Sequence, residues 1–262
     1  MGTKFSTRIW VGVVVIASIF LGSKGYADTV ISVADFGLKP DTRENAVAYV
    51  QKAIEACRGK EPVTLVFPEG RYDFWPQYAH EKNYYETNTY DVFPKRLAML
   101  FEGLHNITVD GNGSQFVMHD RIQPITVENC DGVTLKNFSI DWDIPLTAQA
   151  RVTKVGSDFF EIEINVLESP YIIEDGKLVF VGEGWKSALG SMIEFESDTH
   201  FVVPGTGDLV LGRNWRDYTA VSPRYGIVRL SRKGGFERYP AEGNWLVLRH
   251  STRDHAGIFI CG

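Results

Sequence analysis

Short runs in which apolar and polar residues alternate dominate this chain, and few stretches show helical spacing. In residues 106–113 the apolar positions are Ile107 and Val109, and in residues 132–141 Val133 and Leu135 take equivalent places, 26 residues later. Such alternation is typical of half-buried strands. Asn and Gly flank both units, as expected at corners that need left-handed backbone. The two units therefore predict stacked parallel strands.

One stretch near the start has helical spacing instead. Residues 43–58 place apolar side chains on one face, and Asp41 with Glu44 three residues later resembles a capping box. Gly59 follows as a helix stop. The run Val63–Phe67 then predicts a strand that ends at the turn Pro68-Glu69-Gly70. The helix is predicted to cap one end of the stacked strands, as repeat folds require.

The pattern changes between residues 144 and 248, where strands are joined by hairpin turns. Strands are predicted at 151–155, 159–166, 178–181, 193–196, 227–230 and 245–248. Hairpin-linked strands are antiparallel. Residues 144–248 are therefore predicted to form an inserted antiparallel β-barrel or sandwich. It separates residues 28–143, the cap and first coils, from a return to the parallel stack at 249–262.

The first 27 residues have the pattern of a secretory signal peptide. Lys4 and Arg8 precede an apolar run from Ile9 to Leu21, and small residues precede a cut after Ala27. The run is too short to span a bilayer, so we expect a periplasmic or secreted protein without stable membrane insertion. Cleavage would lower the formal net charge by three, from −6 to −9. This acidic balance argues against nucleic acid as a partner.

The amino-acid sequence of several segments resembles a known family. The Val33–Gly37 segment, the helix and Val66–Tyr72 resemble the N-terminal cap of pectate-lyase-like right-handed parallel β-helices. Read together with the Ser139–Pro145 motif, the insertion and Arg253–Phe259, the chain is similar to bacterial α-1,3-galactosidases of glycoside hydrolase family 110. The resemblance spans the mature chain but less than half of a typical member. It implies an all-β fold, a right-handed parallel β-helix with a capping helix and an inserted barrel, here an N-terminal portion whose C-terminal coils are missing.

The same resemblance implies an exo-acting glycosidase. Such an enzyme releases terminal α-1,3-linked galactose from blood-group-B-like or linear host-type glycans, by inverting hydrolysis without metal or other cofactor. Its partner is a carbohydrate, and the oligomeric state stays open. Two alternatives remain: another β-helix enzyme acting on polysaccharides, such as a polygalacturonase or lyase, and a non-catalytic glycan-binding solenoid or inactive fragment.

Asp141 and Asp143 are the candidate catalytic residues. They lie two apart on a predicted strand end, hence on one face, and flank Trp142. Inverting hydrolysis needs one carboxyl as general acid and another as base, about 6.5–9.5 Å apart. The alternative is that both aspartates only cap a turn before Pro145. The family resemblance places the catalytic aspartates on later coils, beyond this chain.

Four residues are candidate substrate contacts: Arg253, His255, Trp142 and Trp75. Arginine and histidine can donate to sugar hydroxyls, and indole faces stack on the apolar face of galactose. The alternatives are an Arg253–Asp254 pair on a surface turn and aromatic packing over the stacked strands. His250 and His255 lack the neighbouring ligands of a metal site, so none is predicted. The three cysteines are expected to be free thiols.

Overall fold

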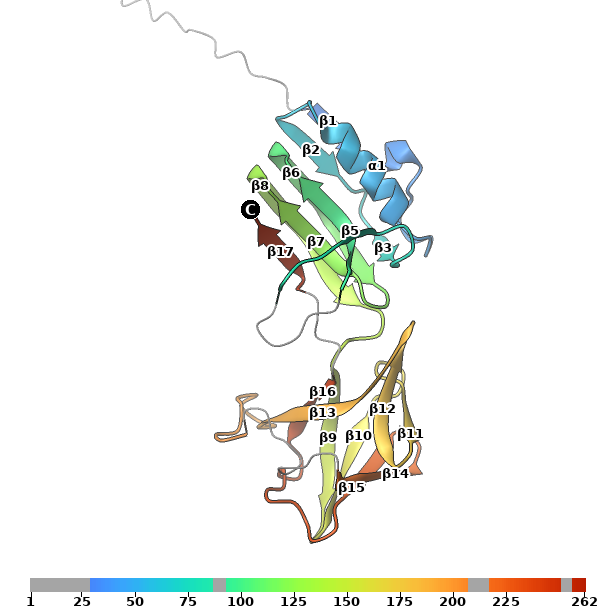
Figure 1. Cartoon of the computed structure of the whole chain (residues 1–262), viewed down its shortest axis with the longest axis vertical. Helices are drawn as coiled ribbons and strands as arrows, with labels where there is room; N and C mark the ends of the chain where they lie inside the picture. Colours follow the sequence, from blue (N-terminus) through green and yellow to red (C-terminus); the bar gives the residue numbers. More distant parts are fainter. Residues whose placement is uncertain (1–28, 87–92, 207–216, 251–255) are drawn as a thin grey trace, which may run out of the picture.

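A computed structural model describes residues 29–86, 93–206, 217–250 and 256–262, so the predicted signal peptide lies outside the described residues. The chain forms two modules arranged end to end (Figure 1). We call residues 29–143 with 256–262 the sheet module, and residues 144–250 the barrel module. Each has its own core of buried apolar side chains. Within the described residues, no helix is both long and apolar enough to cross a bilayer.

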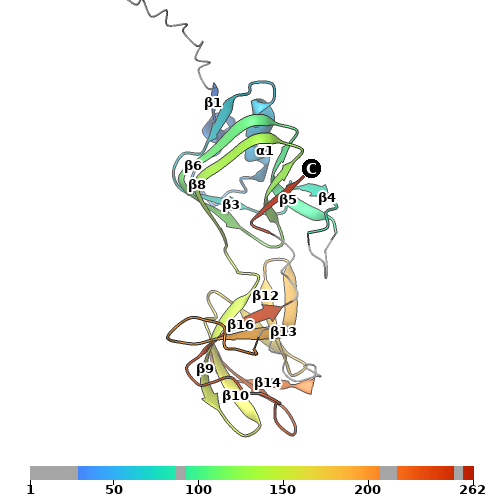
Figure 2. The same cartoon turned by 90° about the vertical axis from the view of Figure 1, so that its left-hand side faces the viewer.

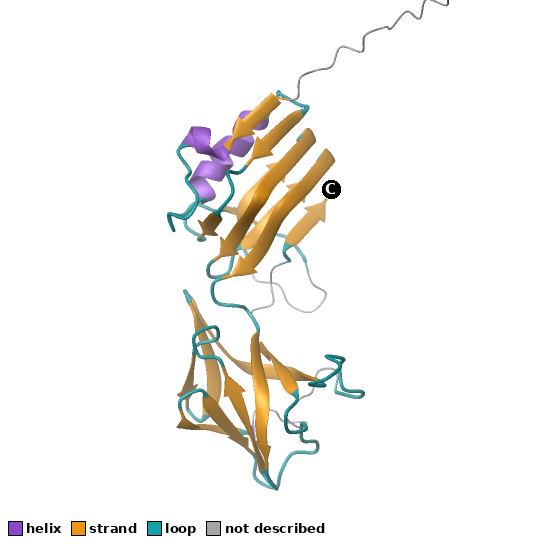
Figure 3. Ribbon diagram, turned by 180° about the vertical axis from the view of Figure 1, so that it is seen from behind, coloured by secondary structure: helices purple, strands orange, loops and turns teal. Residues whose placement is uncertain are grey.

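The sheet module contains two sheets built mainly from parallel strands, with the helix along one side (Figure 3). In one sheet the order is β1-β2-β6-β3, with β8 also paired to β6, and in the other it is β17-β7-β5-β4. The elements are β1 (Thr29–Ser32), the 3-10 helix η1 (Val33–Phe36), α1 (Val47–Cys57), β2 (Val63–Val66), β3 (Arg71–Phe74), β4 (His80–Lys82), β5 (Lys95–Glu102), β6 (His105–Met118), β7 (Gln123–Glu128), β8 (Asp131–Trp142) and β17 (Ile258–Cys261).

The predicted pairing of the two alternating units is confirmed. β6 and β8 are parallel, and Ile107 lies opposite Val133 while Val109 lies opposite Leu135. Ile107 and Val109 are fully buried in the sheet-module core, whereas Val133 and Leu135 are only partly buried against it. The period-two pattern therefore predicted both the register and the inward face of these strands.

The helix is present, but its start differs from the prediction. α1 begins at Val47, and the side chain of Asn45 accepts a hydrogen bond from the Val47 backbone N–H at 3.1 Å. Asp41 instead accepts from the backbone N–H of Arg71 at 2.9 Å. The predicted capping box is therefore wrong, because the Asp41 side chain binds the backbone at the start of β3 instead of the first turn of the helix. Along the helix, Val47, Val50, Ala53, Ile54 and Cys57 are buried.

The barrel module is one eight-stranded antiparallel sheet with the order β11-β12-β13-β16-β9-β10-β15-β14. The sheet curls until its two ends meet, since the Ala220 backbone N–H on β14 donates to the Gly176 carbonyl at 2.7 Å. All six strands predicted in this region are present. The bounds are β9 (Ala148–Val155), β10 (Phe159–Ile164), β11 (Tyr171–Glu174), β12 (Lys177–Gly182), β13 (Trp185–Phe195), β14 (Thr219–Arg224), β15 (Ile227–Ser231) and β16 (Trp245–His250).

The described residues form an all-β fold with one α-helix, but the predicted right-handed parallel β-helix is wrong. The largest sheet is antiparallel, and the parallel strands form two small sheets rather than a continuous solenoid. The physical reason is that the chain leaves the parallel stack after β8 and buries its next apolar strands in a separate core. The expected β-barrel is therefore present, whereas the described strands do not form the expected solenoid.

The chain returns to the sheet module only after the barrel module is complete. β17 pairs in parallel with β7, and Ile258 lies opposite Ile125. Figure 2 shows β17 beside the other strands of the sheet module, above the barrel. Two residues that are 133 positions apart in the sequence thus become neighbours in one sheet.

Candidate functional site

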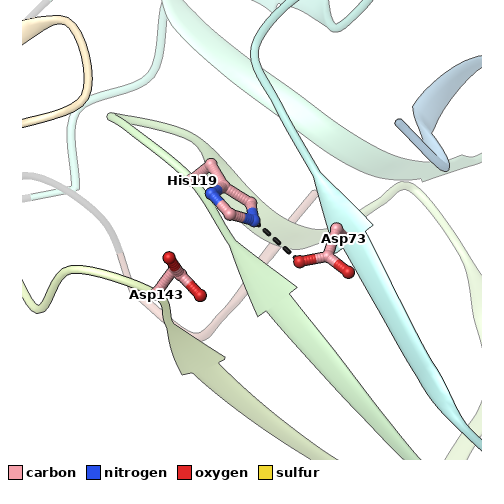
Figure 4. Close-up of side chains that lie close together, drawn as sticks. All are labelled: Asp73, His119 and Asp143. Atoms are coloured by element: carbon pink, nitrogen blue, oxygen red, sulfur yellow. Dashed lines mark hydrogen bonds and ion pairs between the residues drawn. The ribbon is translucent and has the colours of Figure 1, made fainter. Parts of the chain in front are cut away.

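Three polar side chains meet where three neighbouring strands of the sheet module end (Figure 4). Asp73 lies on β3, His119 directly follows β6, and Asp143 directly follows β8. Met118 of β6 lies opposite Phe74 and also opposite Trp142. Since all three strands are parallel, their carboxyl ends lie along the same edge of the sheet, the edge at which the strands end. That edge faces the barrel module.

Asp73 is the buried centre of this cluster, with 1% of its surface exposed. Its Oδ1 lies 2.8 Å from Nε2 of His119 and accepts from the Arg71 guanidinium at 2.6 Å. Burial raises the pKa of Asp73, but the hydrogen bonds from Arg71 and His119 outweigh burial and hold the pKa below its usual value. Asp73 is therefore an ionised carboxylate that receives its neighbours' hydrogen bonds.

Arg71 joins the two carboxylates of the cluster. Its Nη2 donates to Asp73 at 2.6 Å and to Asp143 at 2.7 Å, and Arg43 lies 3.7 Å and 3.6 Å from the same two oxygens. The candidate ligand atoms of Asp73, His119 and Asp143 lie within 4.8 Å of one another. A guanidinium already bridges the two aspartates, so this donor set suits an ion-pair network better than a divalent cation.

His119 connects the cluster to aromatic and acidic partners. Its ring is stacked on the Trp75 indole, with centroids 3.8 Å apart and planes 14° apart. The Trp75 backbone is held in turn by Asn45, which accepts from its N–H at 3.2 Å. The second ring nitrogen of His119, Nδ1, lies 2.6 Å from Glu183 of the barrel module. The cluster therefore links the two modules.

The chemistry of the cluster differs from that of an inverting pair. The atoms of Asp73 and Asp143 that face each other are closer than the roughly 6.5–9.5 Å that leaves room for a water. Both carboxylates are ion-paired with Arg71. A general acid needs a proton to donate, which the lowered pKa of Asp73 disfavours at that residue. The arrangement is suited to orienting side chains and to accepting hydrogen bonds.

The structure separates the two aspartates predicted from the sequence. Both are exposed, while Trp142 between them is partly buried against the sheet-module core. Asp143 belongs to the cluster, whereas Asp141 accepts a hydrogen bond from the Trp142 backbone N–H at 2.8 Å. Their catalytic roles stay predictions.

The predicted substrate contacts have different surroundings. Trp75 is half-buried beside the cluster, stacked on His119. Trp142 packs against the sheet-module core, and its indole Nε1 is buried without a hydrogen-bond partner among the described residues. Arg253 and His255, together with Asp254, lie outside the described residues.

Sequence reasoning missed two members of the cluster, Asp73 and His119, and two residues that contact it, Arg71 and Glu183. One signal was available for Asp73, because an acidic residue stands between Tyr72 and Phe74, both of which are buried. Buried acidic residues almost always have a charged partner. Arg71, two residues earlier on the same strand, is such a partner and was within reach of the local pattern. The contact with His119 depends instead on strand pairing over 46 residues, which the local pattern does not contain.

Comparisons with known proteins agree with the division into modules. Residues 148–246 match the profile of GLAA-B beta-barrel domain I. The chain is 58% identical over 236 residues to "Alpha-1,3-galactosidase B" of Bacteroides thetaiotaomicron, covering 89% of this chain and 38% of that protein. It is 34% identical over 238 residues to "Alpha-1,3-galactosidase A" of Bacteroides fragilis, with the same coverage of 89% and 38%.

A third relative extends the comparison beyond these two species. "Alpha-1,3-galactosidase A" of Shewanella woodyi is 33% identical over 226 residues, which cover 86% of this chain and 36% of that protein. The chain thus spans less than two fifths of the length of these curated relatives. Over most of its own length, in the sheet module and in a barrel that matches GLAA-B beta-barrel domain I, this chain is similar to proteins named alpha-1,3-galactosidase A and B.

Proposed function

We propose that this chain is part of a glycosidase of the α-galactosidase type, which releases terminal α-1,3-linked galactose from glycans. One observation carries the proposal: 58% identity over 236 residues to a protein named alpha-1,3-galactosidase B. The matched barrel at residues 148–246 supports it independently of overall identity. The activity is proposed for the whole protein, of which the chain supplies the sheet module and the first barrel.

The finer features follow from the family resemblance. We infer membership of glycoside hydrolase family 110 and an exo-acting, inverting, metal-independent mechanism on blood-group-B-like or linear host-type glycans. The chain is inferred to be an N-terminal portion, secreted or periplasmic after cleavage behind Ala27. Asp141 and Asp143 are proposed as catalytic candidates, and Trp75, Trp142, Arg253 and His255 as substrate contacts.

A chimera tests the activity. The corresponding segment of the Bacteroides thetaiotaomicron relative is replaced by this chain, which is similar enough for both cores to be retained. We expect the chimera to release galactose from Galα1-3Gal, to form β-galactose first by proton NMR, and to keep its rate in EDTA. A folded chimera that releases no galactose, while the unmodified relative does, contradicts the proposal.

The same chimera decides the roles of the two aspartates. A group that serves as general acid or base contributes about 10²–10⁴-fold to the rate, so Asp141→Asn or Asp143→Asn should lower the rate constant by that amount if the residue is catalytic. Asp131→Asn is the matched control, since Asp131 is an exposed aspartate on the same strand β8. Rates equal to that control assign both residues a structural role.

A further inference from the structure

Four outward-facing side chains form a continuous row across four neighbouring strands of the barrel module. Phe195 on β13 lies opposite Trp245 on β16, Trp245 lies opposite Arg151 on β9, and Arg151 lies opposite Glu163 on β10. Adjacent strands lie about 4.8 Å apart, so the row is about 14 Å long. It is therefore long compared with a single sugar ring.

Two open hollows flank Trp245 on this face. The first, of about 520 Å³, is lined by Phe195, His200 and Val247, and the second, of about 560 Å³, is lined by Arg151, Glu163 and Glu168. Trp245 and Gln149 line both hollows. The Trp245 side chain is 38% exposed. An indole thus stands between two depressions and is accessible to a ligand.

Most of the polar side chains around the indole have no partner within the part of the chain that the structure describes. Among the described residues, the side chains of Gln149, Arg151, Glu163 and Glu168 form no hydrogen bond or ion pair. Arg151 and Glu163 are direct cross-strand neighbours, yet their charged groups are not within ion-pair distance. Donors and acceptors on this face are therefore available to a bound molecule.

We propose that this face of the barrel module is a binding subsite for a neutral oligosaccharide. The indole of Trp245 would stack on the apolar face of one sugar ring, while Gln149, Arg151 and Glu163 would bind hydroxyl groups beside it. One arginine and two glutamates give the second hollow a slightly acidic balance, which disfavours phosphate and other polyanions. Only the choice of the galactosyl probe rests on the proposed function.

Binding is tested with the full 262-residue chain. The Nε1–H resonance of Trp245 is assigned in NMR spectra by its loss in Trp245→Phe, and the chain is titrated with Galα1-3Gal and with N-acetyllactosamine. We expect a saturable shift of this resonance with at least one of the two saccharides. Heparin, a polyanion, should leave it in place. No shift with either neutral saccharide, or a shift with heparin alone, overturns the proposal.

Substitutions then locate the contact, with affinities measured by calorimetry because Trp245→Ala lacks the indole resonance. Trp245→Ala should weaken binding about tenfold or more, as the loss of an aromatic stack predicts. Arg151→Met, a change at an exposed position, should weaken binding too, and it guards against misfolding of the tryptophan variant. Tyr225→Ala is the control, since Tyr225 is 79% exposed on the same module outside both hollows. Unchanged affinity in Trp245→Ala and Arg151→Met would refute the subsite.

The two proposals fail separately. Galactose release is measured in the chimera, and the NMR titration is measured in the chain. Release without a shift of the Trp245 resonance refutes the subsite alone. A shift without release refutes the proposed activity alone.

Discussion

Nδ1 of His119, in the sheet module, lies 2.6 Å from Oε2 of Glu183, in the turn between β12 and β13 of the barrel module. The next residue, Gly184, lies close to the side chain of Asp120 as well. A Cβ on the adjacent Gly184, which has a φ of +73°, would lie 2.6 Å from Oδ2 of Asp120. The two modules therefore contact each other where the end of β6 meets the turn between β12 and β13.

Replacing His119 is expected to destabilise the sheet module. His119→Ala removes a hydrogen-bond partner from buried Asp73, so the free energy of unfolding should fall by about 1–3 kcal/mol. Glu183→Gln should cost less, because Glu183 is 41% exposed. Urea unfolding of both single variants and the double variant measures the coupling, expected at about 1 kcal/mol. Fully additive effects would show that the contact does not join the modules.

Asp73 should make the free energy of unfolding depend on pH in the acid range. Because its folded pKa is lowered, its contribution is fully present above the pKa of the unfolded chain and is lost as pH falls through the folded value. Asp73→Asn should therefore be less stable than the wild type near neutral pH, and the difference should shrink below about pH 4. Urea unfolding at several pH values measures this difference. A difference independent of pH would contradict the assignment.

His250 should give a second pH dependence, at higher pH and inside the barrel. Burial, reinforced by Arg121, lowers the pKa of His250 to about 4. The free energy of unfolding is then unaffected by His250 above the pKa of the unfolded chain, about 6.5, and falls as the pH drops from there towards 4. The loss between pH 7 and pH 5 should be about 2 kcal/mol. His250→Phe keeps the ring contacts with Phe180 and Trp185 and should remove this loss. Equal slopes in both proteins would disprove it.

Two glycines allow the cost of a left-handed backbone to be measured separately from the cost of steric crowding. Gly132 and Gly103 have similar positive φ values, +66° and +62°, but only at Gly132 would a Cβ meet a neighbour, Oδ1 of Asn106 at 2.6 Å. Gly103→Ala should cost about 1–2 kcal/mol for the left-handed conformation. Gly132→Ala should cost clearly more, since the Asn106 side chain, and its backbone N at 3.3 Å, must move to make room. Equal losses in urea unfolding would show that Asn106 gives way freely.

Much of the fold follows from local pattern. The alternation around Ile107 and Val133 predicted the β6–β8 register, and the helical spacing after residue 43 predicted α1. These predictions are correct because each depends on which side of one element is buried. The continuous solenoid is wrong because it depends on how many strands stack, which a two-unit repeat does not specify.

The candidate site was less accessible to sequence reasoning. Asp143 was singled out from a strand end, but its partner Arg71 is 72 residues away, and Asp73 and His119 are 46 residues apart. These contacts arise only once the second half of β6 pairs with both β3 and β8. Contacts between side chains on strands far apart in the sequence produce no periodic pattern in the sequence. Their cluster is therefore visible only in the folded chain.

The pairing of β17 with β7 also has a kinetic consequence. Closing a flexible loop of about 100 residues costs about 4 kcal/mol of chain entropy. The barrel's first and last strands are paired, with Ala148 opposite Leu248. Once the barrel has folded, its entry and exit are neighbours, and β17 reaches β7 as if across a short connection. Folding the barrel first thus converts one of the most distant contacts in the chain into a nearly local one, which should speed its formation.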